Sequence, residues 1–300
     1  MSAIIHQVKC PACASANIAH SLSAVDYTVS QSAFAIWHCN DCTLRFTQDI
    51  PDAAGIIPYY QSVEYISHSD TNKGIINRLY HLVRNYTLKT KYTLIKKVSG
   101  LNSGKLLDIG AGTGAFSNTM QSKGWEVTGL EPDSTARQQA MNNYQLQLFT
   151  PDTIQALTPA GFDVITLWHV LEHVHDLEGY WNHFQCLLNN KGQLIIAVPN
   201  YTSYDAAYYR EYWAAYDVPR HLYHFSPESI ERLARKHGFK LEATYPMWFD
   251  SFYVSMLSEK YRHKKNKLFS ALIHGLISNI KTIGNSRNCS SVIYQFSKSV

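Results

Sequence analysis

Short apolar runs alternate with helical segments along most of the chain, and this alternation is its clearest pattern. The runs at residues 106–109, 125–130, 162–168 and 194–198 predict buried strands, with helical stretches between them. Alternation of this kind is typical of a parallel sheet that has helices on both faces. The pattern therefore predicts an α/β fold with a doubly wound sheet over residues 105–300.

Two further parts precede this region. Residues 1–50 hold four of the six cysteines, and residues 51–104 begin as a Pro- and Gly-containing linker. Apolar residues then take helical spacing at 73–98, and Gly100 follows as a signal for the end of a helix. We therefore predict a small module at 1–50, a linker and helical segment at 51–104, and the main domain at 105–300.

The cysteines of the first module form two pairs, each with two residues between the thiols. Cys10 and Cys13 make one CxxC turn, and Cys39 and Cys42 make the other. Two such turns can close a tetrahedral site for a structural zinc ion, so the pattern predicts a zinc-ribbon-like module. Two disulfides are the first alternative, which a reducing compartment disfavours. Duplicate redox motifs are the second, although no thioredoxin-like pattern accompanies the pairs.

Composition places the chain among globular proteins, with 300 residues, 45% of them hydrophobic and 17% charged. These values exclude collagen-like, coiled-coil and wholly disordered chains. The net charge of +4 is uneven, because residues 250–300 hold eight Lys or Arg against two Asp or Glu and so carry +6. The first 249 residues carry the remaining −2 and are nearly neutral. No signal-peptide pattern opens the sequence, which predicts a cytoplasmic protein.

A glycine-rich loop follows the first predicted strand of the main domain. Gly110, Gly112 and Gly114 stand between that strand and a helix, where backbone N–H groups can approach a ligand closely. Glu131 ends the next strand and can accept both hydrogens of a ribose diol. These features fit both dinucleotides and S-adenosylmethionine. The carboxylate of Asp108 suits a ligand with a positively charged amino-acid end better than one with a pyrophosphate.

At this point the chain resembles the class I S-adenosylmethionine-dependent methyltransferases in four ordered segments. LLDIGAGTGAF is similar to their first motif, VTGLEPD to their ribose motif, FDVITLWHVLEH to their fourth-strand motif and LIIAVPN to the strand after it. The resemblance implies a Rossmann-like sheet of seven strands and S-adenosylmethionine as the methyl donor. The cofactor-binding residues that it implies are Asp108, Gly110, Gly112, Gly114, Glu131, Trp168 and His169, with Asp152 as the candidate acid for the adenine.

Two groups of histidines are candidates for the proton acceptor that methyl transfer needs when the acceptor carries a proton. His221 and His224 lie in DVPRHLYHFSPESI, which resembles the EHLxYF segment of sugar C-methyltransferases, a family that also begins with a four-cysteine zinc module. On that match His221 is the general base; alternatively, both histidines pack against the sheet edge. His173 belongs to His169-x2-Glu172-His173, which is similar to the ExxEH turn of RNA 3′-end and ubiquinone-pathway O-methyltransferases. That turn either holds a divalent metal or hydrogen-bonds the loop.

The resemblance also assigns the last two strands, to residues 240–248 and 291–298. The insertion between them, at about 249–290, joins a basic stretch to an amphipathic helix. Through residues 258–281 such a segment can contact an anionic membrane surface; alternatively, the helix covers the edge of the sheet. The apolar run at 268–280 is shorter than the roughly 20 residues that span a bilayer.

These observations predict a methyltransferase that acts on a small-molecule acceptor, such as a sugar nucleotide or a quinone-like or lipid-like compound. The aromatic stretch at 201–216 would form a lid over that acceptor. An RNA methyltransferase is one alternative, but residues 1–50 hold only Lys9 and Arg45 against three Asp, a poor surface for phosphates. A catalytically silent protein that binds the cofactor is the second alternative, and a nicotinamide-dependent oxidoreductase is the third.

Overall fold

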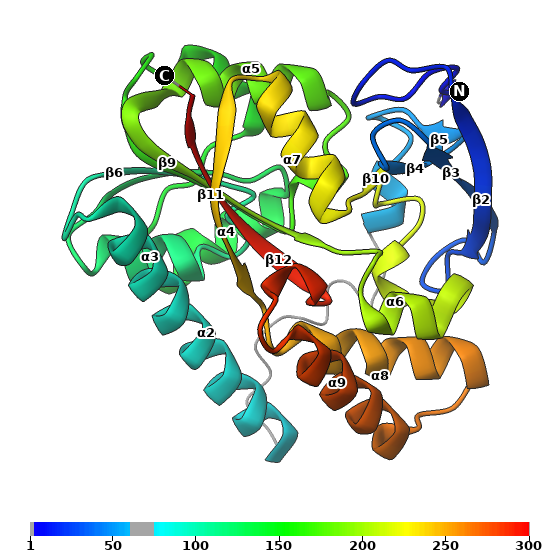
Figure 1. Ribbon diagram of the computed structural model, residues 1–300. Coiled ribbons are helices and arrows are strands. Elements are labelled where there is room, and N and C mark those ends of the chain that lie inside the picture. The colour runs from blue at the N-terminus through cyan, green and yellow to red at the C-terminus, as the bar shows by residue number, and fades with distance from the viewer. Residues whose placement is uncertain (1–2, 61–74, 300) are drawn as a thin grey trace.

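The structure is a computed structural model that describes residues 3–60 and 75–299 (Figure 1). Within these residues a six-stranded sheet crosses the molecule in the order β11-β12-β9-β8-β6-β7. Its parallel strands are β6 (Lys105–Ile109), β7 (Glu126–Leu130), β8 (Phe162–Trp168) and β9 (Leu188–Pro199). Its antiparallel strands are β11 (Phe239–Pro246) and β12 (Ser291–Lys298). The predicted α/β fold is confirmed.

Helices cover both faces of this sheet, as a doubly wound fold requires. On one face, apolar side chains of α5 (Leu177–Leu187) and α7 (Pro227–Lys236) pack in one core with those of the strands. On the other face, α2 (Ile75–Ser99) and α3 (Ala115–Gln121) enclose a second core. The helix α4 (Ser134–Tyr144) follows β7 and packs beside α3. Both faces are thus buried, which explains why the strands read as continuous apolar runs.

The predicted seventh strand is reduced to a single bridge. Phe149 pairs with Leu130 at the outer edge of β7, and its backbone makes two hydrogen bonds, with Gly129 and Glu131. Pro151 follows almost at once and opens a short helical turn, η2 (Pro151–Ala156). Since proline has no N–H to donate and fixes φ, the segment cannot continue along β7. The prediction of seven strands is therefore too high by one among the described residues.

The segment after β8 also differs from its prediction. A helix was expected directly after the strand, but the chain first makes a 3₁₀ turn, η3 (Leu171–His173). The helix α5 begins only at Leu177, where the Asp176 side chain accepts a hydrogen bond from the Gly179 N–H. His173 therefore lies on a tight turn at the end of the sheet and not on a helix face.

The N-terminal module contains two small antiparallel sheets, and the main domain completes the larger one. Its strands are β1 (Ile4–Ile5), β2 (Ile18–Val25), β3 (Ala33–Cys39), β4 (Arg45–Thr47) and β5 (Ile50–Pro51). The strands β1 and β5 pair with each other, and the larger sheet has the order β10-β4-β3-β2, in which β10 (Tyr223–His224) comes from the main domain. A 3₁₀ turn, η1 (Ile57–Tyr60), follows the module. The two parts of the chain therefore share one sheet.

The aromatic stretch predicted as an acceptor lid is mostly buried. It forms α6 (Tyr204–Tyr209), η4 (Arg210–Tyr212) and η5 (Ala214–Tyr216). Tyr209, Trp213 and Tyr216 pack with Ala24 and Ile36 of the module in one apolar cluster. The stretch is therefore a core between the module and the main domain.

The segment predicted as a helical insertion, at about 249–290, contains two helices at the lower edge of the molecule in Figure 1, α8 (Asp250–His263) and α9 (Leu268–Thr282). A short turn, η6 (Ser286–Asn288), leads from them into β12. Across the described residues, no helix is both long enough and apolar enough to cross a membrane.

Candidate active site

The glycine loop between β6 and α3 has a backbone conformation that favours glycine. Gly110, Gly112 and Gly114 all have left-handed φ angles, of 71°, 56° and 78°. A Cβ atom at Gly110 would lie 2.3 Å from the side chain of Val170, and one at Gly114 would lie 2.9 Å from that of Ala140. No atom lies within 4 Å of a Cβ built at Gly112. The loop is thus closely packed at its two ends and open at its middle.

Glu131 lies beside that open position. Its Oε2 accepts a hydrogen bond from the Gly112 N–H at 2.7 Å, and its Oε1 accepts one from the Asp133 N–H at 2.9 Å. Burial raises the pKa of this carboxyl group, against the opposing effect of the two N–H donors. Each oxygen still has a lone pair for a further donor.

Asp108 is buried at the end of β6, where its two oxygens accept from Ser117 Oγ at 2.6 Å and Thr166 Oγ1 at 2.8 Å. Burial raises the pKa of Asp108. Lys91 of α2 brings its Nζ to 4.1 Å from the ring centre of Trp168, and burial lowers the pKa of this lysine to about 8. A cation thus lies beside one predicted cofactor residue, and no pattern in the sequence around Lys91 indicated this role.

His169, at the end of β8, is held between two carboxylates. Its Nε2 lies 3.0 Å from Asp250 Oδ2, and its Nδ1 lies 3.3 Å from Glu172 Oε1. Burial lowers the pKa of His169, but the two hydrogen-bonded carboxylates prevail and raise it from 6.5 to about 10. His169 is therefore a cation at neutral pH.

We expect this ion pair to make stability depend on pH above neutrality. A raised folded-state pKa means that the stabilisation by His169 is complete below pH 6.5 and is lost as the pH rises through about 10. The measurement is urea unfolding of the protein and of His169→Gln from pH 6.5 to 10. The difference in unfolding free energy should shrink over this range; a constant difference would contradict the ion pair.

Glu172, His173 and His221 form a compact buried cluster next to this pair. One potential ligand atom from each lies within 4.8 Å of the others, and the two imidazole rings are 4.6 Å apart. His221 Nδ1 lies 2.9 Å from the Ala215 carbonyl, and His173 Nδ1 lies 3.0 Å from that of Arg220. Because a carbonyl only accepts, each Nδ1 carries the hydrogen and each Nε2 keeps a lone pair.

The remaining contacts of the cluster define its chemistry. Glu172 Oε2 is buried and has no hydrogen-bond partner in the described part of the chain. Burial, and then the neighbouring His221, lowers the pKa of His173 to about 4, so this ring is neutral at pH 7. Asp217 Oδ2 lies 3.8 Å from His221 Nε2. The arrangement can accept a proton at Nε2 of His221, or hold a divalent cation through Glu172 and the two imidazoles.

Residues from five distant segments build this region, and only some of them were predicted from the sequence. His169, His173 and His221 were predicted, and the structure brings them close together. Lys91, Asp217 and Asp250 were not predicted, nor was Tyr60, whose hydroxyl lies 3.0 Å from His173 Nδ1. Nothing in their local sequence pattern marks these four residues.

Two other predicted residues lie apart from the cluster. His224 belongs to β10, where its Nε2 lies 3.1 Å from Thr47 Oγ1 in the shared sheet, and burial lowers its pKa well below 6.5. Asp152 is exposed on η2, beyond the bridge formed by Phe149. The residues that could hold a metal ion differ from those predicted. They are Glu172, His173 and His221, whereas both ring nitrogens of His169 contact carboxylates, those of Asp250 and Glu172.

The four module cysteines converge on one point. Cys10 Sγ lies 3.5 Å from Cys42 Sγ, and Cys13 Sγ lies 3.6 Å from Cys39 Sγ, with all four within 4.8 Å of one another. A tetrahedron of sulfurs around zinc, with bonds of about 2.3 Å, has sulfurs about 3.8 Å apart. All four are free thiols, so the geometry fits a four-thiolate zinc site and not two disulfides.

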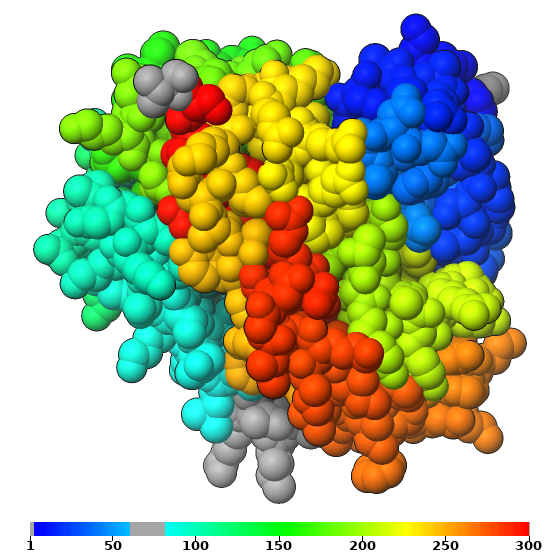
Figure 2. All heavy atoms as spheres, in the orientation of Figure 1, coloured from blue at the N-terminus to red at the C-terminus, as the bar shows by residue number. Residues whose placement is uncertain are grey.

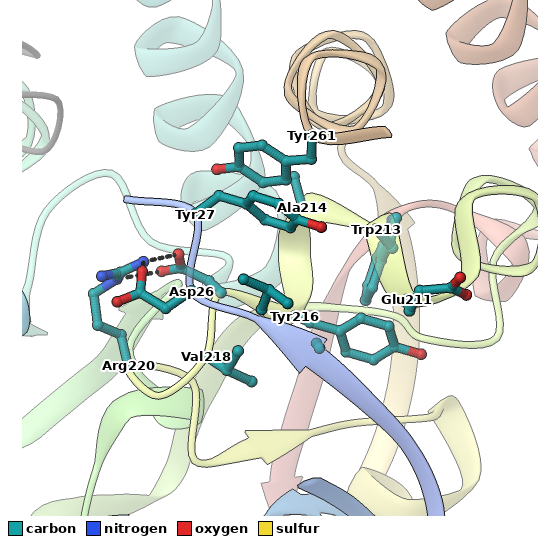
Figure 3. Close-up of a pocket in the computed structure, with 12 residues that line it drawn as sticks. Asp26, Tyr27, Glu211, Trp213, Ala214, Tyr216, Val218, Arg220 and Tyr261 are labelled. Carbon is teal, nitrogen blue, oxygen red and sulfur yellow. Dashed lines mark hydrogen bonds and ion pairs between the residues drawn. The ribbon is translucent and has the colours of Figure 1, made fainter. Parts of the chain in front are cut away.

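Figure 3 shows a pocket between the module and the main domain, lined by Asp26, Tyr27, Arg220 and Tyr261 among others. The buried Arg220 lies 3.5 Å from Asp26 Oδ1 and donates from Nε to Asp217 at 3.0 Å. The cavity has a volume of about 10 Å³, room for no more than a single water molecule. The ion pairs therefore fix Asp217 beside His221, and this pocket is too small for the acceptor.

Comparison with known proteins identifies the family. A family model described as a methyltransferase domain matches residues 83–244, more than half of the chain. The ubiquinone biosynthesis O-methyltransferase of Aeromonas salmonicida is 33% identical over 111 residues, which cover 35% of this chain and 47% of that protein. The protein of the same name from Vibrio cholerae is 34% identical over 96 residues, covering 30% and 39%. The chain thus spans about half the length, or less, of these relatives.

Solved structures show the same fold at low sequence identity. A phosphoethanolamine N-methyltransferase 2 from Haemonchus contortus has a TM-score of 0.54 at 16% identity, covering 85% of this chain and 63% of that one. The magnesium protoporphyrin IX methyltransferase of Synechocystis has a TM-score of 0.53 at 14% identity, covering 80% and 97%. The chain therefore belongs to the methyltransferase domain family, with the fold of the class I S-adenosylmethionine-dependent enzymes.

Proposed function

We propose that this protein transfers a methyl group from S-adenosylmethionine to a small-molecule acceptor and releases S-adenosylhomocysteine. The observation that carries the proposal is the glycine loop, whose open position at Gly112 lies beside the Glu131 carboxylate. Both lie where the parallel strands β6 and β7 end, the edge at which open α/β sheets bind their ligands. Family membership supports the same reaction.

Side chains around the loop offer a partner for each polar part of the donor. The free lone pairs of Glu131 suit the two ribose hydroxyls. The ammonium of Lys91, held over Trp168, suits the carboxylate of the methionine part. Asp108, buried near the end of β6 and two residues before Gly110, would complement the ammonium of the methionine part. We propose these residues, with the N–H groups of the loop, as the donor site.

Methyl transfer is an in-line displacement that the protein assists by orientation and proton removal. A bond forms between the nucleophilic atom of the acceptor and the methyl carbon while the carbon–sulfur bond breaks, and its electron pair stays on sulfur. We propose that the acceptor's proton passes to His221 Nε2, whose tautomer is set by the Ala215 carbonyl. The nearby carboxylates of Glu172 and Asp217 would stabilise the imidazolium that results.

The two relatives named for O-methylation in ubiquinone biosynthesis support an aromatic or quinone-like hydroxyl as the acceptor. A buried base such as His221 suits this chemistry, because a hydroxyl loses its proton as the new bond forms. A second role for the same cluster is to hold a divalent cation, which the unpartnered Glu172 Oε2 favours. Such a cation would bind and polarise the hydroxyl directly.

We propose further that Cys10, Cys13, Cys39 and Cys42 hold a structural zinc ion. The site fixes β3 and the start of β4, and Thr47 of β4 donates a hydrogen bond to the His221 carbonyl at 2.7 Å. The module would thus hold the segment of the proposed base in place.

Calorimetric titration tests the donor. We expect S-adenosylmethionine to bind with micromolar affinity and NADH not to bind. Glu131→Ala should weaken S-adenosylmethionine binding at least 10-fold, because two ribose hydroxyls lose a charged acceptor, worth about 1.5–3 kcal/mol. Glu126→Ala, which removes an exposed carboxylate at the other end of β7, is the matched control for lost negative charge. Binding of NADH alone, or unchanged affinity in Glu131→Ala, would contradict this donor site.

A further inference from the structure

The helix α9 exposes large apolar side chains along one face. Phe269 has 78% of its surface accessible, and Leu272, Leu276 and Ile280 are each more than half exposed. Their positions recur at spacings of three and four residues, so they form a continuous stripe along the helix. Leu268, Ile273 and Ile283 are exposed on or next to the same stripe.

The fully buried residues of α9, on its other face, are all small. Ala271, Gly275, Ser278 and Thr282 are buried, and a Cβ at Gly275 would meet Phe252 of α8 at 2.6 Å. The helix is thus reversed relative to an ordinary surface helix, since its small side chains face the protein and its large apolar ones face outward. Packing against the described residues, 3–60 and 75–299, therefore does not account for the stripe. A large exposed apolar surface of this kind is typical of a site that contacts a membrane or another molecule.

The charges around the stripe have one sign. Arg262 is exposed in the last turn of α8, and Lys264, Lys265 and Lys267 are exposed between α8 and α9. Lys281 is exposed in the last turn of α9. The sequence from 260 to 290 contains no Asp or Glu. An apolar stripe with cations at both ends is complementary to a bilayer whose headgroups are anionic and whose interior is hydrocarbon.

We propose that α9 lies in the plane of an anionic lipid bilayer, with Phe269, Leu272 and Leu276 inserted among the acyl chains. The cations before the helix would then contact the lipid phosphates. Figure 2 shows α9 and the segment before it on the outer surface at the lower edge of the molecule. With 15 residues, the helix is about 22 Å long, shorter than a bilayer core, so it can lie on the membrane but not cross it.

The charges around the stripe favour a bilayer, and not a second copy of the chain, as the partner that contacts it. A two-fold contact between α9 helices would bring the cation clusters of both copies to one interface, with no acidic residue of this segment to neutralise them. Anionic lipids neutralise them directly. The proposal stands whether or not the donor and base assigned above are correct.

Co-sedimentation of the full-length protein with vesicles tests it. We expect binding to vesicles of phosphatidylglycerol and phosphatidylcholine and little binding to phosphatidylcholine alone. Changing Lys264, Lys265 and Lys267 to Gln should lower the partition coefficient about 100-fold, at about 1 kcal/mol for each cation near the surface. Leu272→Ser with Leu276→Ser should lower it at least 10-fold by removing inserted apolar area.

Matched variants elsewhere on the surface test whether the loss of vesicle binding is specific to α9 and the segment before it. Changing the exposed Lys96, Lys123 and Lys191 to Gln removes the same charge, and Val8→Ser removes an exposed apolar side chain from the distant module. Both should bind vesicles as the parent protein does, and all variants should retain S-adenosylmethionine affinity if they are folded. Equal binding to both vesicle types would overturn the proposal. So would a dimer in lipid-free solution that Leu272→Ser with Leu276→Ser abolishes.

Discussion

Replacing His221 with alanine should lower the rate of methyl transfer by about 100- to 10,000-fold, the usual contribution of a positioned general base. The reason is the geometry of its ring, because the Ala215 carbonyl holds the hydrogen on Nδ1 and leaves the Nε2 lone pair beside Glu172, His173 and Asp217. The measurement is transfer of labelled methyl groups to a panel of small phenols and catechols, using the acceptor that the parent protein methylates fastest.

The affinity for S-adenosylmethionine should stay within a factor of about two in His221→Ala, because the donor site is built from other residues. Raising the pH should restore part of the lost activity, since a phenol that is already ionised needs no base. His20→Ala, at an exposed histidine of the module, is the matched control and should keep full activity. A fully active His221→Ala would remove this residue as the base.

Added Mg²⁺ or a chelator separates the two proposed roles of the cluster. If His221 acts as a base alone, neither should change the rate. Loss of activity in a chelator that removes no zinc, with recovery on addition of Mg²⁺, would assign Glu172, His173 and His221 to a cation.

Replacing Cys39 with serine should remove the proposed zinc and unfold the module. Metal analysis should find about one zinc per chain in the parent protein and none in this variant. A structural four-cysteine site contributes folding free energy on the order of 10 kcal/mol, and the core of the module around Cys39 is small. We expect a lower-temperature unfolding transition, with activity lost as well, because Thr47 and β4 hold the backbone of residues 221–224.

Cys186→Ser is the control for this experiment, because Cys186 is a single exposed cysteine outside the module. It should retain zinc, stability and activity. If the parent protein contained no zinc, and Cys39→Ser were as stable as Cys186→Ser, the four thiols would return to the redox interpretation.

The fold was largely predictable because its signals are local. A strand of a parallel sheet that is buried on both faces is largely apolar, so β6, β8 and the second half of β9 were visible as runs in the sequence. The glycine loop was visible because its backbone takes left-handed φ angles at three positions, and at Gly110 and Gly114 neighbouring side chains also leave no room for a Cβ. Two predictions were wrong because the local sequence indicated the structure only weakly. The segment after β8 begins with a 3₁₀ turn and not with the expected helix, and the expected seventh strand is cut short before Pro151.

The sequence by itself determined the fold class, the positions of the glycine loop and of Glu131, and the arrangement of the four module cysteines in two CxxC turns. Only the tertiary structure decided which histidines meet, because His173 and His221 are brought together with Glu172 by contacts between segments far apart in the chain. It also decided that the module and the main domain share a sheet, and that α9 directs its large apolar residues outward. Helical spacing reveals that a helix has an apolar face, but which face packs inward depends on what the rest of the chain presents to it.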